Sequence, residues 1–130
     1  MLEVNIHSFS YKQSGIPKDL SENGGGFVFD CRFIENPGRH IEFATLNGKD
    51  SKVITFLENN SKMQEFLNNV FNIIDNAIEN YTGRKFSYLM VSFGCTGGRH
   101  RSVYGAEKLK QHLNDKFKDI ILVRLTHNDL

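Results

Sequence analysis

Apolar and polar residues alternate in the first part of the chain, as they do in a strand with one buried face. Residues 2–9 show this alternation and predict the first strand. Residues 27–33 form a more apolar run and predict a second, more buried strand. Glycines and a proline over 10–25 predict a loop between them, and Asn36-Pro37-Gly38 breaks the chain after the second strand.

Helical spacing replaces this alternation in the middle of the chain. Residues 50–58 predict a short helix with Asp50 as its N-cap, and residues 62–80 predict a longer one after Ser61, a good N-cap residue. Thr82-Gly83 predicts the end of the longer helix. Its apolar face consists of Met63, Phe66, Leu67, Val70, Phe71, Ile74 and Ile78.

The last third of the chain repeats the order of strand, helix and strand. Residues 86–93 predict a strand covered on both faces, a second long helix follows the glycine-rich residues 94–98, and residues 120–123 predict the last strand. Two parallel strands joined by a helix require a right-handed crossover. We therefore predict an α/β fold with a short, largely parallel sheet and helices packed on it, including a phosphate-binding strand–loop–helix unit at 86–116.

Composition narrows the class of protein further. The 130 residues suit one domain over 1–130, and 16 Lys+Arg against 15 Asp+Glu leave a net charge of +1. This balance argues against a strongly cationic nucleic-acid binder but leaves room for a local basic patch. Apolar runs are too short to span a membrane, and the first residues lack the features of a signal peptide. We therefore expect a cytoplasmic protein with no membrane partner.

Cysteine content limits the chemistry. Cys31 and Cys95 are the only two cysteines, and in a reducing compartment they are thiols by default. Zinc needs more ligands at familiar spacing than these and the scattered histidines supply. We expect no metal site and no cofactor.

The glycine-rich segment at 94–102 carries the clearest functional signal. It reads Gly-Cys-Thr-Gly-Gly-Arg-His-Arg-Ser and lies between a buried strand and an amphipathic helix. Glycines let backbone N–H groups converge, and the helix N-terminus adds about half a positive charge. The side chains of Arg99, His100 and Arg101 add further donors. These features favour an anion, most simply a phosphate.

Other interpretations of this segment remain open. A tight strand–helix turn that binds nothing would also contain glycines. The spacing is not that of a Walker A loop, which needs a lysine before its Ser/Thr. Cys95, five residues, Arg101 and Ser102 match the loop of cysteine-dependent phosphatases, in which a thiolate attacks phosphorus. Against that activity, Gly94 stands where those enzymes usually have His, and no aspartate presents itself as general acid.

Residues 94–103 also carry a family resemblance. They are similar to the Gly-Cys-Thr-Gly-Gly-x-His-Arg-Ser-Val signature of the C-terminal domain of RapZ-family RNase adapter proteins. Further segments resemble this family in the same order along the chain, namely 8–12 with 15–17, 29–37, 46–50 and 127–130. The resemblance therefore spans essentially the whole sequence.

The resemblance implies a non-catalytic regulatory domain. It also implies the properties of enterobacterial members, which bind small regulatory RNAs, present one to an endoribonuclease and sense glucosamine-6-phosphate, an amino-sugar phosphate. The domain also occurs alone or beside kinases that resemble aminoglycoside phosphotransferases. For this chain we expect a phosphorylated small molecule as ligand, with RNA, a sugar kinase-like protein and an oligomer left open as partners. An RNA-binding adapter is the alternative function, and the cysteine phosphatase is the second alternative.

The glycine-rich segment and the family resemblance together indicate which residues bind the ligand. The expected ligand-binding positions are Cys95, Thr96, Gly97, Gly98, Arg99, His100, Arg101, Ser102, Asp30, Arg32 and Asn36. Lys12, His40 and His127 are further candidates, and the candidates for RNA contact are Arg39, Arg99, Arg101 and Lys108. Asp30 and Arg32 lie on one side of a predicted strand, where they either face the loop or form a structural ion pair.

Two departures from the family pattern qualify these expectations. Gly38 stands where the family usually has His, and His40 is the residue that could replace it. The P-loop kinase-like domain of full-length members is absent from these 130 residues, so ATP binding is not carried over.

Overall fold

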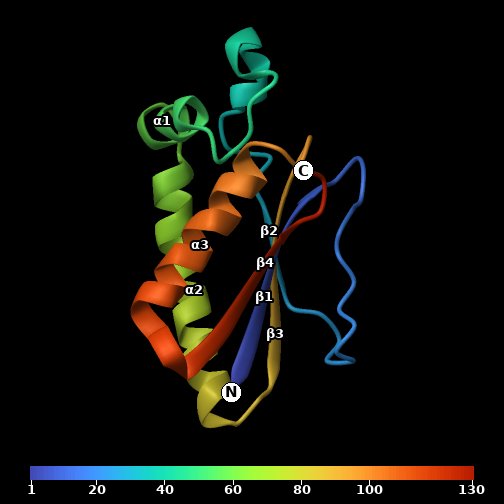
Figure 1. Ribbon diagram of the computed structural model, residues 1–130, viewed down its shortest axis with the longest axis vertical. Coiled ribbons are helices and arrows are strands. Elements are labelled where there is room, and N and C mark those ends of the chain that lie inside the picture. Colours follow the sequence, from blue (N-terminus) through green and yellow to red (C-terminus); the bar gives the residue numbers. More distant parts are fainter.

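A four-stranded parallel sheet forms the centre of the computed structural model, which describes residues 1–130 (Figure 1). The strands are β1 (Leu2–Ser10), β2 (Phe27–Asp30), β3 (Tyr88–Cys95) and β4 (Ile121–His127). Their order is β2-β3-β1-β4, and every neighbouring pair is parallel. The predicted α/β class with a parallel sheet is confirmed.

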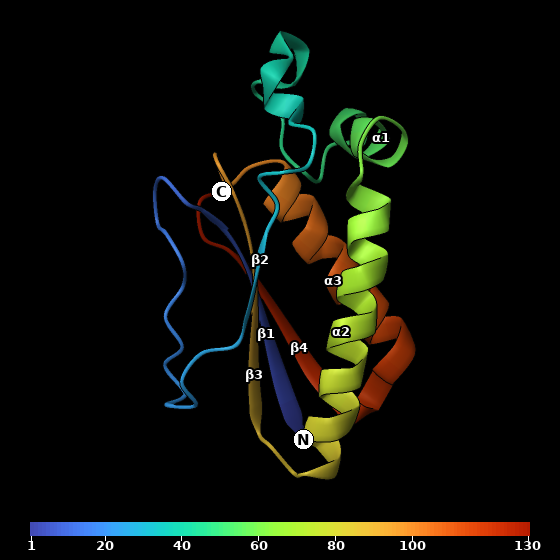
Figure 2. The ribbon, with the colours of Figure 1, turned by 180° about the vertical axis from the view of Figure 1, so that it is seen from behind.

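Three helices accompany the sheet: α1 (Ser51–Asn59), α2 (Met63–Gly83) and α3 (Arg101–Phe117). Short 3-10 turns lie at Pro37–Arg39, Ile41–Phe43 and Lys118–Ile120. Figures 1 and 2 show α2 and α3 side by side on one face of the sheet, while the loop between β1 and β2 runs along the other face. None of the helices combines the length and apolarity needed to cross a membrane.

The core lies between the sheet and α2 with α3. Alternate residues of β1 face this side, and Val4 and Ile6 are almost completely buried there. Phe93 on β3 packs edge-on against Phe66 of α2 with 6.5 Å between the ring centroids. The periodicity of the sequence therefore identifies the faces that meet, because each strand or helix buries the face on which its apolar residues recur.

The observed strand boundaries differ from the predicted ones where tertiary pairing decides them. β2 ends at Asp30 rather than 33, because Cys31 begins a turn that the Ile34 N–H closes on the Cys31 carbonyl. β4 extends to His127 rather than 123, because it pairs with β1 as far as the pair Ser8 and His127. β3 covers Tyr88–Cys95 rather than 86–93.

The helix ends also differ in detail. Asp50 precedes α1, but its carboxylate accepts a hydrogen bond from the Asn47 N–H at 2.7 Å and caps no helical N–H. α2 begins at Met63 and ends at Gly83, so the end predicted by Thr82-Gly83 is confirmed and the helix extends beyond the predicted span 62–80. Ser61 is not its N-cap residue, yet the hydroxyl of Ser61 accepts from the Met63 N–H at 3.1 Å.

Candidate functional site

The carboxyl ends of the parallel strands meet at one edge of the sheet, where the turn after β3 leads into α3 (Figure 1). Ligands of open α/β sheets bind at this edge. A cavity of about 280 Å³ lies here between the turn that follows β2 and the start of α3. It is lined by Arg32, Phe33, Ile34, Glu35, Asn36, Arg39, Thr96 and Arg101. Three of these side chains are arginines, so the cavity favours an anion.

Arg101 joins the two walls of this cavity. Its Nη1 donates to the backbone oxygens of Arg32 at 2.9 Å and Ile34 at 2.8 Å, and more weakly to that of Cys31 at 3.4 Å. The residue is only 3% exposed, and its Nε has no hydrogen-bond partner. A buried donor without a partner is costly, and Arg101 also lines the cavity, where its positive charge attracts an anion.

Asp30 and Arg32 form an ion pair rather than two independent ligands. Arg32 donates from Nη2 to Asp30 at 2.7 Å and from Nε to the same carboxylate, while its guanidinium lies 3.7 Å from the centre of the Tyr11 ring. The hydrogen bonds from Arg32 hold the pKa of Asp30 below its ordinary value. Only Arg32 of this pair lines the cavity, so Asp30 positions the arginine.

Several backbone N–H groups beside the cavity are free to donate hydrogen bonds. None of the N–H groups from Gly97 to Val103 donates a hydrogen bond within the protein, and no side chain caps α3. Gly98 has φ +70°, and a side chain there would collide with Ser10. Successive free N–H groups at a helix N-terminus attract anions.

The thiol of Cys95 points away from this arrangement. Cys95 belongs to the hydrophobic core, is 2% exposed and donates to the hydroxyl of the buried Ser102 at 3.1 Å. Neither residue lines the cavity. Cys31, the next residue after β2, is also a buried free thiol, and burial raises its pKa. A nucleophilic cysteine needs an accessible thiolate, so this geometry does not favour the phosphatase alternative.

Arg99 and His100 hold the neighbouring segment against the turn. The Arg99 carbonyl accepts from the Gly48 N–H at 2.7 Å, and Nε2 of His100 lies 3.0 Å from the Phe43 carbonyl oxygen. A Cβ added at Gly38, the position at which the family usually has His, would lie 3.4 Å from the His100 ring. Neither side chain lines the cavity, although both belonged to the expected ligand set.

The remaining candidates lie outside the cavity. Lys12 is exposed, and His40 packs against Phe43 and Phe56 with ring centroids 5.8 and 5.2 Å apart. His127 bridges two other side chains, and Lys108 lies 3.8 Å from a carboxylate oxygen of Glu58.

Sequence reasoning missed two features. Glu35 lines the cavity as its only carboxylate, and hydrogen bonds from its own N–H and from the Lys62 N–H lower its pKa. The sequence signal for Glu35 was its position between Arg32 and Asn36, which were both expected to bind the ligand. The second feature is a chain of hydrogen bonds in which His127 joins the buried Ser8 to Glu107, each over 2.6 Å. Nothing in the local pattern connects those three positions.

Known proteins are similar to this chain over nearly all of its length. The family model described as the RapZ C-terminal domain matches residues 2–130. The chain is 37% identical to a protein of Glaesserella parasuis serovar 5 and 40% identical to one of Thermotoga sp. (strain RQ2), each over 129 residues. Both are named nucleotide-binding protein, and the alignments cover 99% and 98% of this chain but 42% of each relative. The chain therefore spans less than half the length of these relatives, and it belongs to the RapZ C-terminal domain family.

Proposed function

We propose that this chain is a non-catalytic regulatory domain that binds a phosphorylated small molecule, specifically an amino-sugar phosphate such as glucosamine-6-phosphate, in the arginine-lined cavity. The observation that carries the proposal is Arg101, a buried cation whose Nε has no partner within the protein, in the wall of a cavity that also contains Arg32 and Arg39. Charge-assisted hydrogen bonds to phosphate are strong and directional, which suits these groups.

Each side of the cavity has a distinct role in this proposal. The arginines and the free N–H groups of Gly97, Gly98 and Arg99 hold the phosphate. Glu35 is the only carboxylate in the lining and accepts from the ammonium group of an amino sugar. Asn36 and Thr96 supply neutral groups for the sugar hydroxyls. The family membership and the names of the relatives support a ligand that carries phosphate.

The test is a calorimetric titration with inorganic phosphate, glucose 6-phosphate and glucosamine-6-phosphate. Arg39→Ala removes one exposed arginine from the cavity. We expect it to weaken the binding of each of the three ligands about tenfold, which corresponds to about 1.4 kcal/mol of binding free energy. Glu35→Gln is expected to remove only the preference for the amino sugar. Arg124→Ala, an exposed arginine on β4 outside the cavity, is the matched control. Equal affinity of Arg39→Ala and wild type would contradict the proposal.

Catalysis is tested separately from binding. We propose that no phosphatase activity resides in residues 1–130, because the Cys95 thiol lies in the core. Phosphate release from an aryl phosphate is expected to stay at the background rate in wild type and in Cys95→Ser alike. Sustained release that disappears in Cys95→Ser would show that the thiol reaches a substrate.

RNA binding is the second candidate, and one observation favours it. Lys49, Lys108 and Lys110 line a second cavity of about 400 Å³ beside α3. A cluster of lysines suits the phosphates of an RNA backbone, and each phosphate contact makes binding more sensitive to salt. Lys110→Gln is expected to lower affinity for a structured RNA and to reduce the salt dependence. Unchanged affinity and salt dependence would count against this surface.

A further inference from the structure

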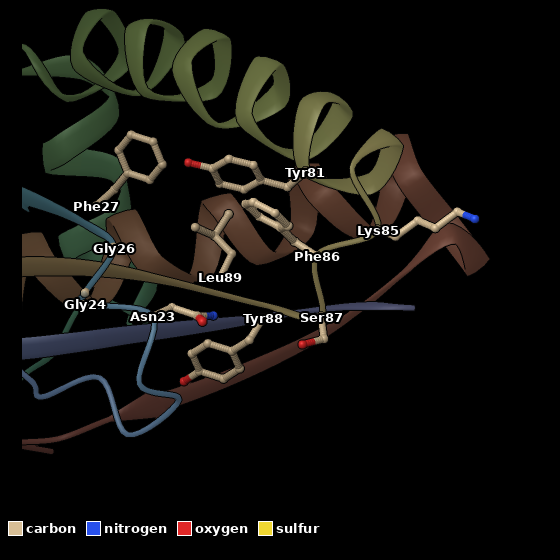
Figure 3. Close-up of a pocket in the computed structure, with 11 residues that line it drawn as sticks. Asn23, Gly24, Gly26, Phe27, Tyr81, Lys85, Phe86, Ser87, Tyr88 and Leu89 are labelled. Atoms are coloured by element: carbon tan, nitrogen blue, oxygen red, sulfur yellow. The ribbon is translucent and has the colours of Figure 1, made fainter.

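A cavity of about 620 Å³ lies at the opposite end of the sheet, where β3 begins (Figure 3). Its lining comes from the loop before β2, the end of α2 and the first residues of β3. β3 runs from Tyr88, which lines this cavity, to Cys95, next to Thr96 of the arginine-lined one, and the two cavities share no lining residue. It is therefore a separate site.

A free strand edge forms part of this cavity. β2 pairs with β3 only from Val91 to Gly94, so the residues Tyr88–Met90 have β1 on one side and no strand on the other. The Ser87 carbonyl accepts from β1, whereas that of Gly94 accepts from the Cys31 N–H on the β2 side. Because this direction alternates along a strand, Tyr88 directs its N–H and C=O toward the open side. An unpaired edge of this kind is a ready hydrogen-bonding template.

Aromatic side chains stand beside this edge. Figure 3 shows Phe27, Tyr81, Phe86 and Leu89 gathered on the side of β3 that faces α2, with Tyr88 on the other side. The rings of Tyr81 and Phe86 have centroids 5.0 Å apart at 30°, and Phe86 is 40% exposed. A flat ring that enters along the strand edge would meet exposed aromatic surface.

Lys85 is the one charged residue that lines the cavity, although the Asp19 carboxylate accepts a hydrogen bond from the N–H of Gly25 in its wall. The Arg84 guanidinium lies 4.4 Å from the centre of the Phe86 ring. Lys85 has φ +61°, a strained conformation for a residue other than glycine, and its N–H donates to Thr82 at the end of α2. Strain of this kind persists where the surrounding structure imposes it. The side of the cavity formed by Lys85 and the neighbouring Arg84 favours an anion.

We propose that this cavity binds a planar nitrogen heterocycle that carries a negative charge, of which a purine nucleotide is the simplest example. The ring stacks on the aromatic side chains, as rings do at separations of about 4.5–7 Å. Its adjacent donor and acceptor atoms pair with the N–H and C=O of Tyr88. Its phosphate lies near Lys85 and Arg84. Neither the arginines nor the glycine-rich turn of the proposed sugar-phosphate site takes part.

The test is an NMR titration of the backbone amides with AMP, adenosine and ribose 5-phosphate. AMP is expected to shift the amides of 24–26 and 86–89, adenosine to shift the same amides at higher concentration, and ribose 5-phosphate to leave them unchanged. AMP shifts confined to 96–103, or no shift at millimolar AMP, would overturn the proposal. So would a response of 86–89 to short RNA but not to AMP, which would make this a nucleic-acid surface.

Matched variants locate the binding. Phe86→Ala and Lys85→Gln are each expected to lower the affinity for AMP at least fivefold. Lys118→Gln is the control, because Lys118 is also an exposed lysine with positive φ but lies outside the cavity. Arg39→Ala should leave AMP binding unchanged while it weakens inorganic phosphate, so the two sites are tested independently. Equal AMP affinity in Phe86→Ala and wild type would contradict the proposal.

Discussion

Arg101 donates from Nη1 to the Ile34 carbonyl oxygen over 2.8 Å, across 67 residues of sequence. The same nitrogen reaches the Arg32 carbonyl at 2.9 Å. The first residue of α3 therefore holds the turn that follows β2, and with it one wall of the cavity at the carboxyl edge of the sheet. One buried side chain serves the fold and faces the candidate ligand site.

Replacing Arg101 should destabilise the protein. Arg101→Met leaves the carbonyls of Arg32 and Ile34 without their donor, and a buried group that loses its partner costs about 1–3 kcal/mol. We expect a loss of about 2–4 kcal/mol in the free energy of unfolding, measured with urea. Arg39→Ala, at an exposed position in the same cavity, should change stability by no more than about 0.5 kcal/mol. Equal stability of the two variants would contradict this role of Arg101.

Gly94 is expected to tolerate no side chain. A Cβ there would collide with the rings of Phe9 and Tyr11, which pack edge to face at 4.8 Å. Gly94→Ala should cost about 1–3 kcal/mol, the usual effect of overpacking. Gly97→Ala is the control, because a Cβ at Gly97 meets nothing within 4 Å. Thermal unfolding of both variants checks the difference, and a neutral Gly94→Ala would refute the close packing.

The ion pair of Asp30 and Arg32 should make stability depend on pH at the acid end. The hydrogen bonds from Arg32 lower the pKa of Asp30 from its ordinary 3.8, so the folded state binds this proton less readily than the unfolded state. The ion pair therefore makes its full contribution to the free energy of unfolding at pH values above the ordinary pKa of Asp30. This contribution is lost as the pH falls through the pKa that Asp30 has in the folded state. Asp30→Asn should lower Tm near neutrality, with a gap to wild type that closes toward pH 3.

The control for this pH dependence is Asp119→Asn, because Asp119 makes no ion pair. Its gap to wild type should stay small from pH 3 to 6. A constant gap between Asp30→Asn and wild type over the same range would show that the ion pair does not stabilise the fold.

Ser8 and His127 should be energetically coupled. The fully buried Ser8 hydroxyl lies 2.6 Å from Nδ1 of His127, whose Nε2 meets Glu107. A double-mutant cycle with Ser8→Ala and His127→Phe is expected to give a coupling of about 0.5–3 kcal/mol. The exposed pair of His7 and Asn128, 3.2 Å apart, is the comparison and should give a much smaller value. Additive effects of Ser8→Ala and His127→Phe would rule out the coupling.

The order of strands and helices was predictable because it depends on local periodicity. Alternation over residues 2–9 and helical spacing over 62–80 were sufficient to place β1 and α2. The position of the glycine-rich turn between β3 and α3 followed in the same way, and the resemblance to the family agreed with it. Element boundaries were less predictable, since β4 continues to His127 only because β1 provides a partner.

The sequence by itself determined the α/β class, the glycine-rich turn and the family, because periodicity and motif spacing are properties of neighbouring residues. Only the tertiary structure decided which of the motif residues line the cavity. In the folded protein Cys95 lies in the core, and His100 contacts the Phe43 carbonyl oxygen. Glu35 and Arg39 line the same cavity as Arg101. The physical reason is that each cavity wall comes from a different segment, and the relative position of segments is determined by long-range packing and hydrogen bonds such as that between Arg101 and Ile34.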